Sequence, residues 1–465
     1  MKKLILCLSL SFFSLSIAAQ SSQSVETLTL EKSVRIAITN SVAVLQAKGN
    51  YELTGAQVLQ AYGQFLPSLS ASVGYTPIAL NQRINPTTLP GGVVIFPLFA
   101  QRTTGLNFNI VSSLNLFNGL ADQAGLQQAL SNNRGSEYTL TRAKQDIAFN
   151  VAQGYLQILL NQELLRISQE NLKASQERLR QLQEQTRLGS RAIADLYQQE
   201  AQKAADELAV IRADNTLRNS KLALLRQLRL EPTKEYEFVQ PATDTTMLDE
   251  QYKNEQALIS AALESRADVK GSQESVNANS WAVTQARSTY LPQLNLNFSF
   301  GSNGFNVLSQ SIDGASVNPP ALPSLLSQVG NQLGYSLGLQ LSWTLFDRFS
   351  TNLRQQQAEI TFQNSQLAYE DLKIRVAVEV KQALGDYNAA ISQLESTRRG
   401  LVSAEKAFET VQKRYEVGSA TFVEVITAQA ALVQAQSNRA QAVFNFTFQK
   451  KILEYFLGKT DVNSL

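Results

Sequence analysis

Residue types that commonly carry out chemistry are scarce in this sequence. The 465 residues include no histidine, and the one cysteine is Cys7. This composition excludes histidine-dependent catalytic triads and zinc sites built on histidine or cysteine. Carboxylates could still act as acids and bases, but the sequence shows no clustered acid pair and no nucleophile motif. We therefore expect no enzyme activity, no metal site and no cofactor.

Residues 1–19 are typical of a cleaved secretory signal. Lys2 and Lys3 precede an apolar core that ends in small residues at Ala19, as export signals require. An uncleaved anchor is the alternative, but the apolar core is shorter than a membrane-spanning helix needs. Cys7 would be removed with the signal, so thiol chemistry and disulfides are excluded from the mature chain. No later stretch reaches the roughly 18 apolar residues of a transmembrane helix.

The mature chain is formally neutral. The whole sequence has 41 Lys and Arg against 39 Asp and Glu, and loss of Lys2 and Lys3 leaves 41 − 2 = 39 basic residues. A nucleic-acid-binding protein usually carries a basic face. We therefore expect no nucleic acid partner.

A duplicated long helix dominates the elements that must position the remaining polar residues. Within 147–191 an apolar residue recurs at every seventh position, and the same row recurs 229 residues later (380 − 151 = 229). The rows are Val151, Ile158, Leu165, Leu172 and Leu179, then Val380, Tyr387, Leu394, Leu401, Phe408 and Tyr415. The rows stop at Leu188-Gly189-Ser190 and Val417-Gly418-Ser419, where glycine is a common helix end. A heptad row predicts a supercoiled helix, and the constant offset indicates an internal duplication.

Four stretches instead alternate apolar and small uncharged polar residues with period two. They are 69–75, 105–117, 294–300 and 335–346. One alternative is a half-buried sheet on a soluble core. The small polar face and the aromatic residues near the strand ends instead favour membrane strands with a watery interior, which need about 9–11 residues. The Leu, Ile, Phe and Trp faces would then contact lipid.

Four such strands cannot close a barrel, and lipid tolerates no open sheet edge. Several copies must therefore pool their strands, two copies giving eight and three copies giving twelve. The joining segments 76–104 and 301–334 are rich in Pro, Gly, Asn and Ser. We expect both to be mobile surface loops.

The remaining helices follow the same duplication. One begins at Leu28-Thr29-Leu30-Glu31, breaks near Gly49, and ends at Leu66-Pro67 before the first strand. Asn118 and Asp347 are candidate caps of the long helices. The predicted divisions are a signal peptide (1–19), a first repeat (20–229) with a strand pair (68–117) and a long helical hairpin (119–229), a linker (230–256), a second repeat (257–457) with a strand pair (293–346) and a long helical hairpin (348–457), and a tail (458–465).

Together these motifs resemble the TolC-type outer-membrane efflux proteins, over nearly all of the mature sequence. The resemblance implies a membrane α+β fold: a homotrimeric 12-stranded barrel in a Gram-negative outer membrane, with four strands per chain, continued by an α-helical coiled-coil tunnel in the periplasm. Residues 230–256 are the candidate equatorial segment. The implied partners are two further copies, outer-membrane lipid, a periplasmic membrane-fusion (adaptor) protein and a proton-driven or ATP-driven inner-membrane pump.

The resemblance also implies roles for residues near the hairpin tips. Asp195 and Tyr415 match a polar network that closes the periplasmic end, and Glu424 matches an acid of the aperture. Ala420 stands where the family often has arginine, so either the closed end is held more weakly or Arg191 of the other hairpin substitutes. Thr427 stands where a second aperture acid can occur. The adaptor-docking tips are Leu188, Gly189, Ser190, Val417, Gly418 and Ser419.

These assignments compete with simpler interpretations. Asp195 and Glu424 could lie on a solvated helix face, and Tyr415 could merely continue the heptad row. The implied function is a passive exit duct for small molecules such as drugs. The alternatives are the channel of a type I protein secretion system, which has the same architecture, and a structural or adhesive surface coiled coil.

Overall fold

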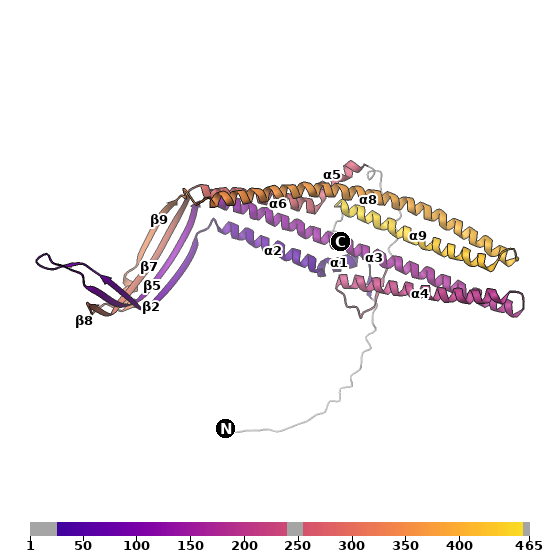
Figure 1. Cartoon of the computed structure of the whole chain (residues 1–465), viewed down its shortest axis with the longest axis horizontal. Coiled ribbons are helices and arrows are strands. Elements are labelled where there is room, and N and C mark those ends of the chain that lie inside the picture. The colour runs from indigo at the N-terminus through magenta and orange to yellow at the C-terminus, as the bar shows by residue number, and fades with distance from the viewer. Residues whose placement is uncertain (1–25, 240–253, 459–465) are drawn as a thin grey trace, which may run out of the picture. The chain divides into compact units, whose positions relative to one another are not determined.

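A computed structural model describes residues 26–239 and 254–458. The predicted signal peptide, the middle of the 230–256 linker and the tail after residue 458 lie outside the described residues. Contacts group the chain into two compact units, and each unit contains segments of both sequence repeats (Figure 1). The hairpin unit comprises residues up to 45, 144–258 and 380–465, and the strand unit comprises 46–143 and 259–379.

An antiparallel sheet forms one end of the strand unit. Its long strands, side by side in Figure 1, lie in the order β2-β5-β7-β9. They are β2 (Ser68–Ile84), β5 (Leu98–Phe117), β7 (Gln293–Ile312) and β9 (Gly334–Ser342). A short fifth strand, β8 (Ala315–Val317), pairs with the distal end of β7. The four predicted strands thus exist and pair with one another.

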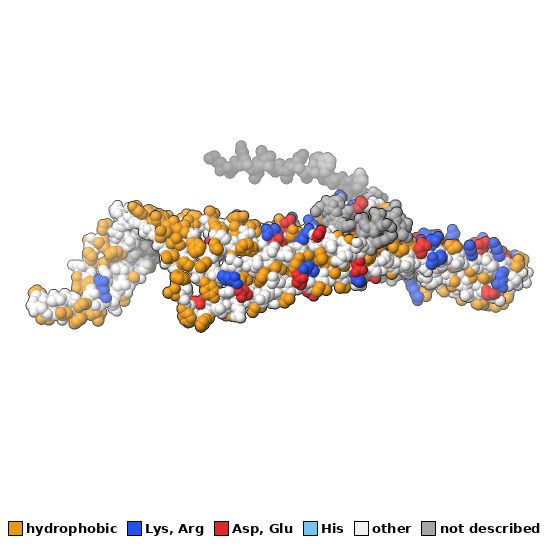
Figure 2. All heavy atoms as spheres, turned by 90° about the horizontal axis from the view of Figure 1, so that it is seen from above, with side chains coloured by type: hydrophobic (Ala, Val, Ile, Leu, Met, Phe, Trp, Pro, Cys, Tyr) orange, Lys and Arg blue, Asp and Glu red, His pale blue; other side chains and the backbone are white. Residues whose placement is uncertain are grey.

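The predicted apolar face is continuous across the sheet. Ala71 pairs with Ile110, Ile110 pairs with Phe300, and Phe300 pairs with Tyr335. The apolar side chains of the two outer strands are largely exposed, as at Val73 (73%) and Leu339 (66%). In Figure 2, blue and red side chains gather over the helices, whereas the strand end is mostly orange and white.

The structure corrects the expected loops and one strand end. Strand β2 continues to Ile84 and β5 begins at Leu98, so most of 76–104 is a long hairpin whose tip holds β3 (Thr87–Thr88) and β4 (Val94–Ile95). Pro77 falls where the register of β2 shifts, a place where its missing N–H breaks no ladder bond.

The second expected loop also contains regular structure. Strand β7 runs on to Ile312, and the 301–334 segment also includes β8 and a helix, α7 (Leu325–Asn331). Strand β9 ends at Ser342, four residues before the predicted end, because the chain there turns toward the preceding helices. The Trp343 indole Nε1 donates to the carbonyl oxygen of Tyr290 at 3.0 Å.

The two long helices end where the sequence predicts. Helices α3 (Ala121–Arg187) and α8 (Ser350–Glu416) have 67 residues each, which corresponds to about 100 Å. Helices α4 (Ile193–Leu228) and α9 (Phe422–Phe456) return antiparallel to them. Within the described residues, none of the helices combines the length and apolar character needed to cross a membrane.

Both predicted caps are present at the start of the long helices. The Asn118 side-chain oxygen accepts from the backbone N–H of Asp122 at 3.3 Å. The Asp347 carboxylate accepts from the backbone N–H of Thr351 at 2.7 Å. These bonds satisfy amides that lack partners within the first helical turn.

The shorter helices break at equivalent places in the two repeats. One pair is α1 (Leu30–Asn40) and α2 (Val42–Gly63), and the other is α5 (Glu255–Ser265) and α6 (Ala267–Arg287). The first break is therefore at Ser41, not near Gly49 as predicted. Gly49 stays helical, because an isolated glycine lowers helix stability without ending the helix.

The second break, at Arg266, is held by a buried ion-pair cluster. Arg266 is 2% exposed, donates to both carboxylate oxygens of Asp268 at 3.0 and 2.6 Å, and donates to Glu379 at 2.7 Å. Burial is the largest single influence and acts to raise the pKa of Asp268, but the hydrogen bonds from Arg266 and the positive charges of Arg142 and Arg266 together outweigh it and lower this pKa. Buried charge thus supports the turn at Arg266.

The first residues of both predicted heptad rows are buried in the core of the hairpin unit, whereas the members nearer the tips, such as Leu179 and Phe408, are only partly buried. Val151, Ile158 and Val380 are fully buried, and Tyr387 is 4% exposed. Strands β1 (Glu26–Leu28) and β6 (Tyr236–Phe238) pair in parallel beside this core. The hydroxyl of Tyr155 lies 2.7 Å from the carbonyl oxygens of Leu28 and Val239. The start of the 230–256 linker is thereby anchored to helix α3.

Candidate functional site at the hairpin tips

Each helical hairpin reverses through the same backbone motif. Gly189 (φ 71°) and Gly418 (φ 77°) adopt the left-handed conformation that glycine accepts without steric cost. The next residue, Ser190 or Ser419, donates its backbone N–H to the carbonyl of Gln185 or Arg414 at 2.9 and 2.8 Å. Each glycine also donates its N–H to the carbonyl three residues earlier, at 3.0 Å. The two bonds together form a Schellman helix end.

The tips expose apolar side chains to solvent. Leu188 is 70% exposed and Val417 is 80% exposed. A Cβ atom built on Gly189 or Gly418 meets no atom within 4 Å. Each tip thus presents an apolar side chain that the described chain leaves uncovered.

Three of the predicted gate residues lie together. The Tyr415 hydroxyl donates to the Asp195 carboxylate at 3.2 Å. The Arg191 guanidinium carbon lies 4.1 Å from the centre of the Tyr415 ring, and its Nη2 donates to the Tyr415 carbonyl at 2.9 Å. The first hairpin supplies Arg191 and Asp195, and the second supplies Tyr415. These contacts therefore tie the two hairpins of one chain together.

The protonation of Tyr415 suits its role as a donor in this cluster. Burial, with the nearby Asp195 carboxylate, raises the pKa of Tyr415 to about 12. The raised pKa means that the folded state favours the neutral phenol. This contribution to stability is complete below the ordinary value of about 10 and is lost as the pH rises through about 12. At neutral pH the hydroxyl keeps its hydrogen.

Glu424, the predicted aperture acid, lies on the first turn of α9 and contacts its own hairpin. Its carboxylate accepts from the Thr421 N–H at 2.6 Å, while Thr421 Oγ1 accepts from the Glu424 N–H at 3.3 Å. This reciprocal arrangement is a capping box. The bond from the Thr421 backbone lowers the pKa of Glu424. Arg414, 4.0 Å away, also belongs to the second hairpin.

A second set of polar contacts between the hairpins escaped the sequence interpretation. Gln429 on α9 donates to the side-chain oxygen of Asn171 on α3 at 2.6 Å. Asn171 in turn donates to the buried carboxylate of Asp206 on α4 at 2.9 Å. Farther toward the tips, Arg178 lies 5.7 Å from the Phe408 ring. No local motif in the sequence distinguishes these residues from the other polar residues of the helices.

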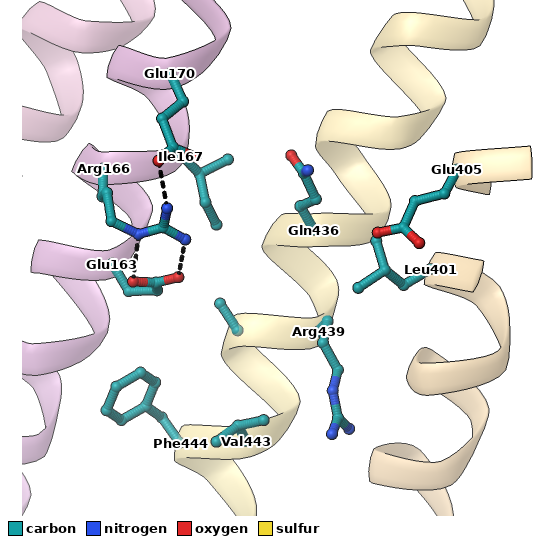
Figure 3. Close-up of a pocket in the computed structure, with 11 residues that line it drawn as sticks. Glu163, Arg166, Ile167, Glu170, Leu401, Glu405, Gln436, Arg439, Val443 and Phe444 are labelled. Atoms are coloured by element: carbon teal, nitrogen blue, oxygen red, sulfur yellow. Dashed lines mark hydrogen bonds and ion pairs between the residues drawn. The ribbon is translucent and has the colours of Figure 1, made fainter. Parts of the chain in front are cut away.

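A groove of about 350 Å³ lies between α3, α8 and α9 of the hairpin unit. Figure 3 shows Arg166 turned toward Glu163 and Glu170, to which its guanidinium nitrogens donate at 2.6–2.9 Å. These hydrogen bonds lower the pKa of Glu163. Glu163 and Glu170 of this groove therefore each pair with Arg166 and not with one another.

Two helical hairpins, each built on a 67-residue helix and joined in duplicate to an antiparallel sheet with a continuous apolar face, define the class of outer-membrane channels with a periplasmic helical extension. The family model described as outer membrane efflux protein matches residues 34–228 and 258–446. The chain belongs to this family, and the resemblance drawn from the sequence is confirmed. It is an outer-membrane efflux channel of a Gram-negative bacterium whose helices extend into the periplasm.

The relatives are distant in sequence, and the solved structures are similar in fold. Outer membrane protein TolC of Salmonella enteritidis is 23% identical over 365 residues, which cover 78% of this chain and 72% of the relative. Pyoverdine export outer membrane protein OpmQ of Pseudomonas putida is 24% identical over 293 residues, covering 63% and 57%. The Campylobacter jejuni CmeC channel superposes with a TM-score of 0.74 at 17% identity, over 94% of this chain and 88% of CmeC.

Proposed function

We propose that three copies of the chain form one duct through which small molecules passively leave the cell, as the outer-membrane component of a tripartite efflux system. The observation that carries the proposal is the pair of free sheet edges. Strands β2 and β9 are the outer long strands, and in the described chain each pairs with one long neighbour only. An unpaired backbone group in lipid costs several kcal/mol. Three copies would pair β9 of each copy with β2 of the next, in a barrel of 3 × 4 = 12 long strands.

An exposed heptad row on α8 supports assembly independently of the sheet. Leu353, Ile360, Leu367 and Ile374 recur every seven residues and are 51–68% exposed. A row with this spacing predicts a helix packed against a partner helix. Within the described chain the row has no cover, so a neighbouring copy is its natural partner in the trimer. Outer-membrane lipid would contact the apolar face of the sheet.

The tips are the proposed docking surface for a periplasmic adaptor, which in turn contacts an inner-membrane pump. Leu188 and Val417 are the most exposed apolar side chains there, and the two tips repeat the same backbone motif. Residues 230–256 are proposed as the equatorial segment. The relative named for pyoverdine export favours small-molecule cargo over the protein cargo of a type I secretion duct.

The contacts between hairpins suit a closed periplasmic end. Asp195, Tyr415 and Arg191 would hold the second hairpin against the first until transport begins. Three copies of Glu424 would form a ring of carboxylates at the aperture, which attracts cations. Thr427 supplies no second acid, so this ring carries one charge per chain.

The proposal is tested with the detergent-purified protein and with cells that lack the gene. We expect native mass measurement to report three chains, and the gene to restore export of a fluorescent dye to deletion cells. A monodisperse monomer would overturn the shared barrel. Normal dye export by the deletion cells, with a secreted protein lost from their medium, would overturn the small-molecule assignment.

A further inference from the structure

The barrel-forming part of the chain is almost free of charge. Residues 66–120 and 291–346 contain three charged side chains, those of Arg83, Arg102 and Asp313. In the whole chain, by contrast, 17% of residues are charged. A cation in such surroundings has few competing charges, so its position determines the local field.

The pairing of the strands places Arg83 and Arg102 on opposite faces. Arg83 on β2 pairs with Phe99 on β5, and its guanidinium carbon lies 5.5 Å from the centre of the Phe99 ring. Successive side chains of a strand alternate between faces. Phe99 therefore shares the polar face of β5 with Asn107 and Asn109, whereas Arg102 shares the face of the apolar residues Leu106, Phe108 and Ile110.

Arg83 also lies far from the helices along its strand. The last β7 residue that pairs with β9 is Gly301, which pairs with Asn109, and Asn109 pairs with Ser72 on β2. Arg83 comes 83 − 72 = 11 residues later. At about 3.3 Å per residue and a strand tilt near 45°, Arg83 lies about 25 Å farther from the helices than Ser72 does, measured along the barrel axis. Because the helices extend into the periplasm, Arg83 lies toward the outside of the cell.

Arg83 has no ion-pair partner in the described part of the chain. Among the residues that the structure describes, no carboxylate lies within 4.0 Å of the Arg83 guanidinium. The Asp313 carboxylate accepts from the backbone N–H of Leu98 at 2.7 Å, at the turn after β7. The stacking on Phe99 keeps the Arg83 guanidinium on the polar face, because an aromatic ring attracts a cation to its surface.

We propose that three copies of Arg83 form a ring of positive charge inside the external mouth of the duct, where it binds anionic cargo and multivalent anions. The inference rests on the trimeric duct proposed above and adds a selectivity site at its outer end. Rings of arginine favour anions in pores. We take three positive charges, each about 10 Å from a trivalent anion, and reduce their Coulomb attraction by the salt screening over one Debye length at 0.1 M salt. Relative to a mouth without these charges, binding of the anion is then favoured about tenfold.

The test is block of single-channel current by pyrophosphate in a planar bilayer. Protein added to one compartment leaves its long helices there, so pyrophosphate in the opposite compartment meets the barrel mouth. We expect Arg83→Gln to raise the half-blocking concentration about tenfold in 0.1 M salt. Arg83→Lys should retain block, and Arg102→Gln, on the other face, should leave it unchanged.

The outcomes separate this inference from the proposed function. If Arg83→Gln conducts normally and its pyrophosphate block equals that of the native protein, the ring is refuted and the duct stands. An equal loss of block in Arg102→Gln would also refute the ring, because the effect would then depend on net charge and not on the polar face. Failure of the native protein to form channels would refute the duct itself.

Discussion

Removal of the Tyr415 hydroxyl is the most informative perturbation of the closed end. Tyr415→Phe deletes one hydrogen bond to Asp195, of 3.2 Å, and keeps the ring that Arg191 covers at 4.1 Å. Such a bond contributes about 1 kcal/mol net. If three chains open together, the closed state loses about 3 kcal/mol, which raises the open-to-closed ratio on the order of 100-fold.

Single-channel recording in planar bilayers measures this ratio directly. We expect Tyr415→Phe to increase open probability and mean conductance, and Asp195→Asn, which keeps an acceptor, to have a smaller effect. Asp195→Ala combined with Tyr415→Phe should exceed the stronger single variant only slightly, since the two changes remove one shared bond. Native conductance in Tyr415→Phe, or full additivity in the double variant, would refute a closing role for this pair.

Three further outcomes test other parts of the account. Gly418→Ile should abolish dye export while the trimer still assembles, because the left-handed backbone there disfavours a β-branched residue and the proposed docking tip would be distorted. Gly400→Ile, at an open helical site, is the control. Dye export by Gly418→Ile would place adaptor docking elsewhere. Leu339→Arg, near the middle of β9, should lower the stability of the folded protein in the membrane by about 2–4 kcal/mol, and Gln340→Arg should lower it much less. Equal assembly yields of the two variants would show that the lipid-facing and interior faces are misassigned. Glu424→Gln keeps the capping box but should weaken the block of channel current by divalent cations added from the helical side. Because the pKa of native Glu424 is lowered, block of the native channel should persist at pH 5 and fade only below about pH 4.3. Unchanged block in the variant would mean that Glu424 is a capping residue alone.

Local sequence signals were sufficient wherever one segment determined its own structure. The ends of the long helices at Arg187 and Glu416 follow from a heptad row stopped by glycine. The Thr421–Glu424 capping box was also visible, because threonine three residues before glutamate is a known helix start. Glu424 was nevertheless assigned only through the family resemblance, and its capping bonds became evident in the structure.

Features that depend on distant partners were missed. The distal half of β2 exists because Ile84 pairs with Leu98, and the proline and glycine content of that segment concealed the pairing. The contact between Asn171 and Gln429 joins residues 258 positions apart, and amide side chains on a hydrated helix carry no signal of a partner. Arg191 was proposed from the absence of arginine at residue 420, and its contacts with Tyr415 supply the physical basis for that proposal.

Disulfide trapping between sheet edges tests the shared barrel most directly. The mature chain is expected to lack cysteine, so Val73→Cys on β2 with Leu339→Cys on β9 introduces a single reactive pair. Within one chain β5 and β7 separate these strands by about 14 Å, beyond the reach of a disulfide. Neighbouring positions such as Ala71 and Leu337 cover alternative registers. The account predicts oxidation products that stop at three linked chains; persistent monomers at every register, or a ladder extending past three chains, would contradict it.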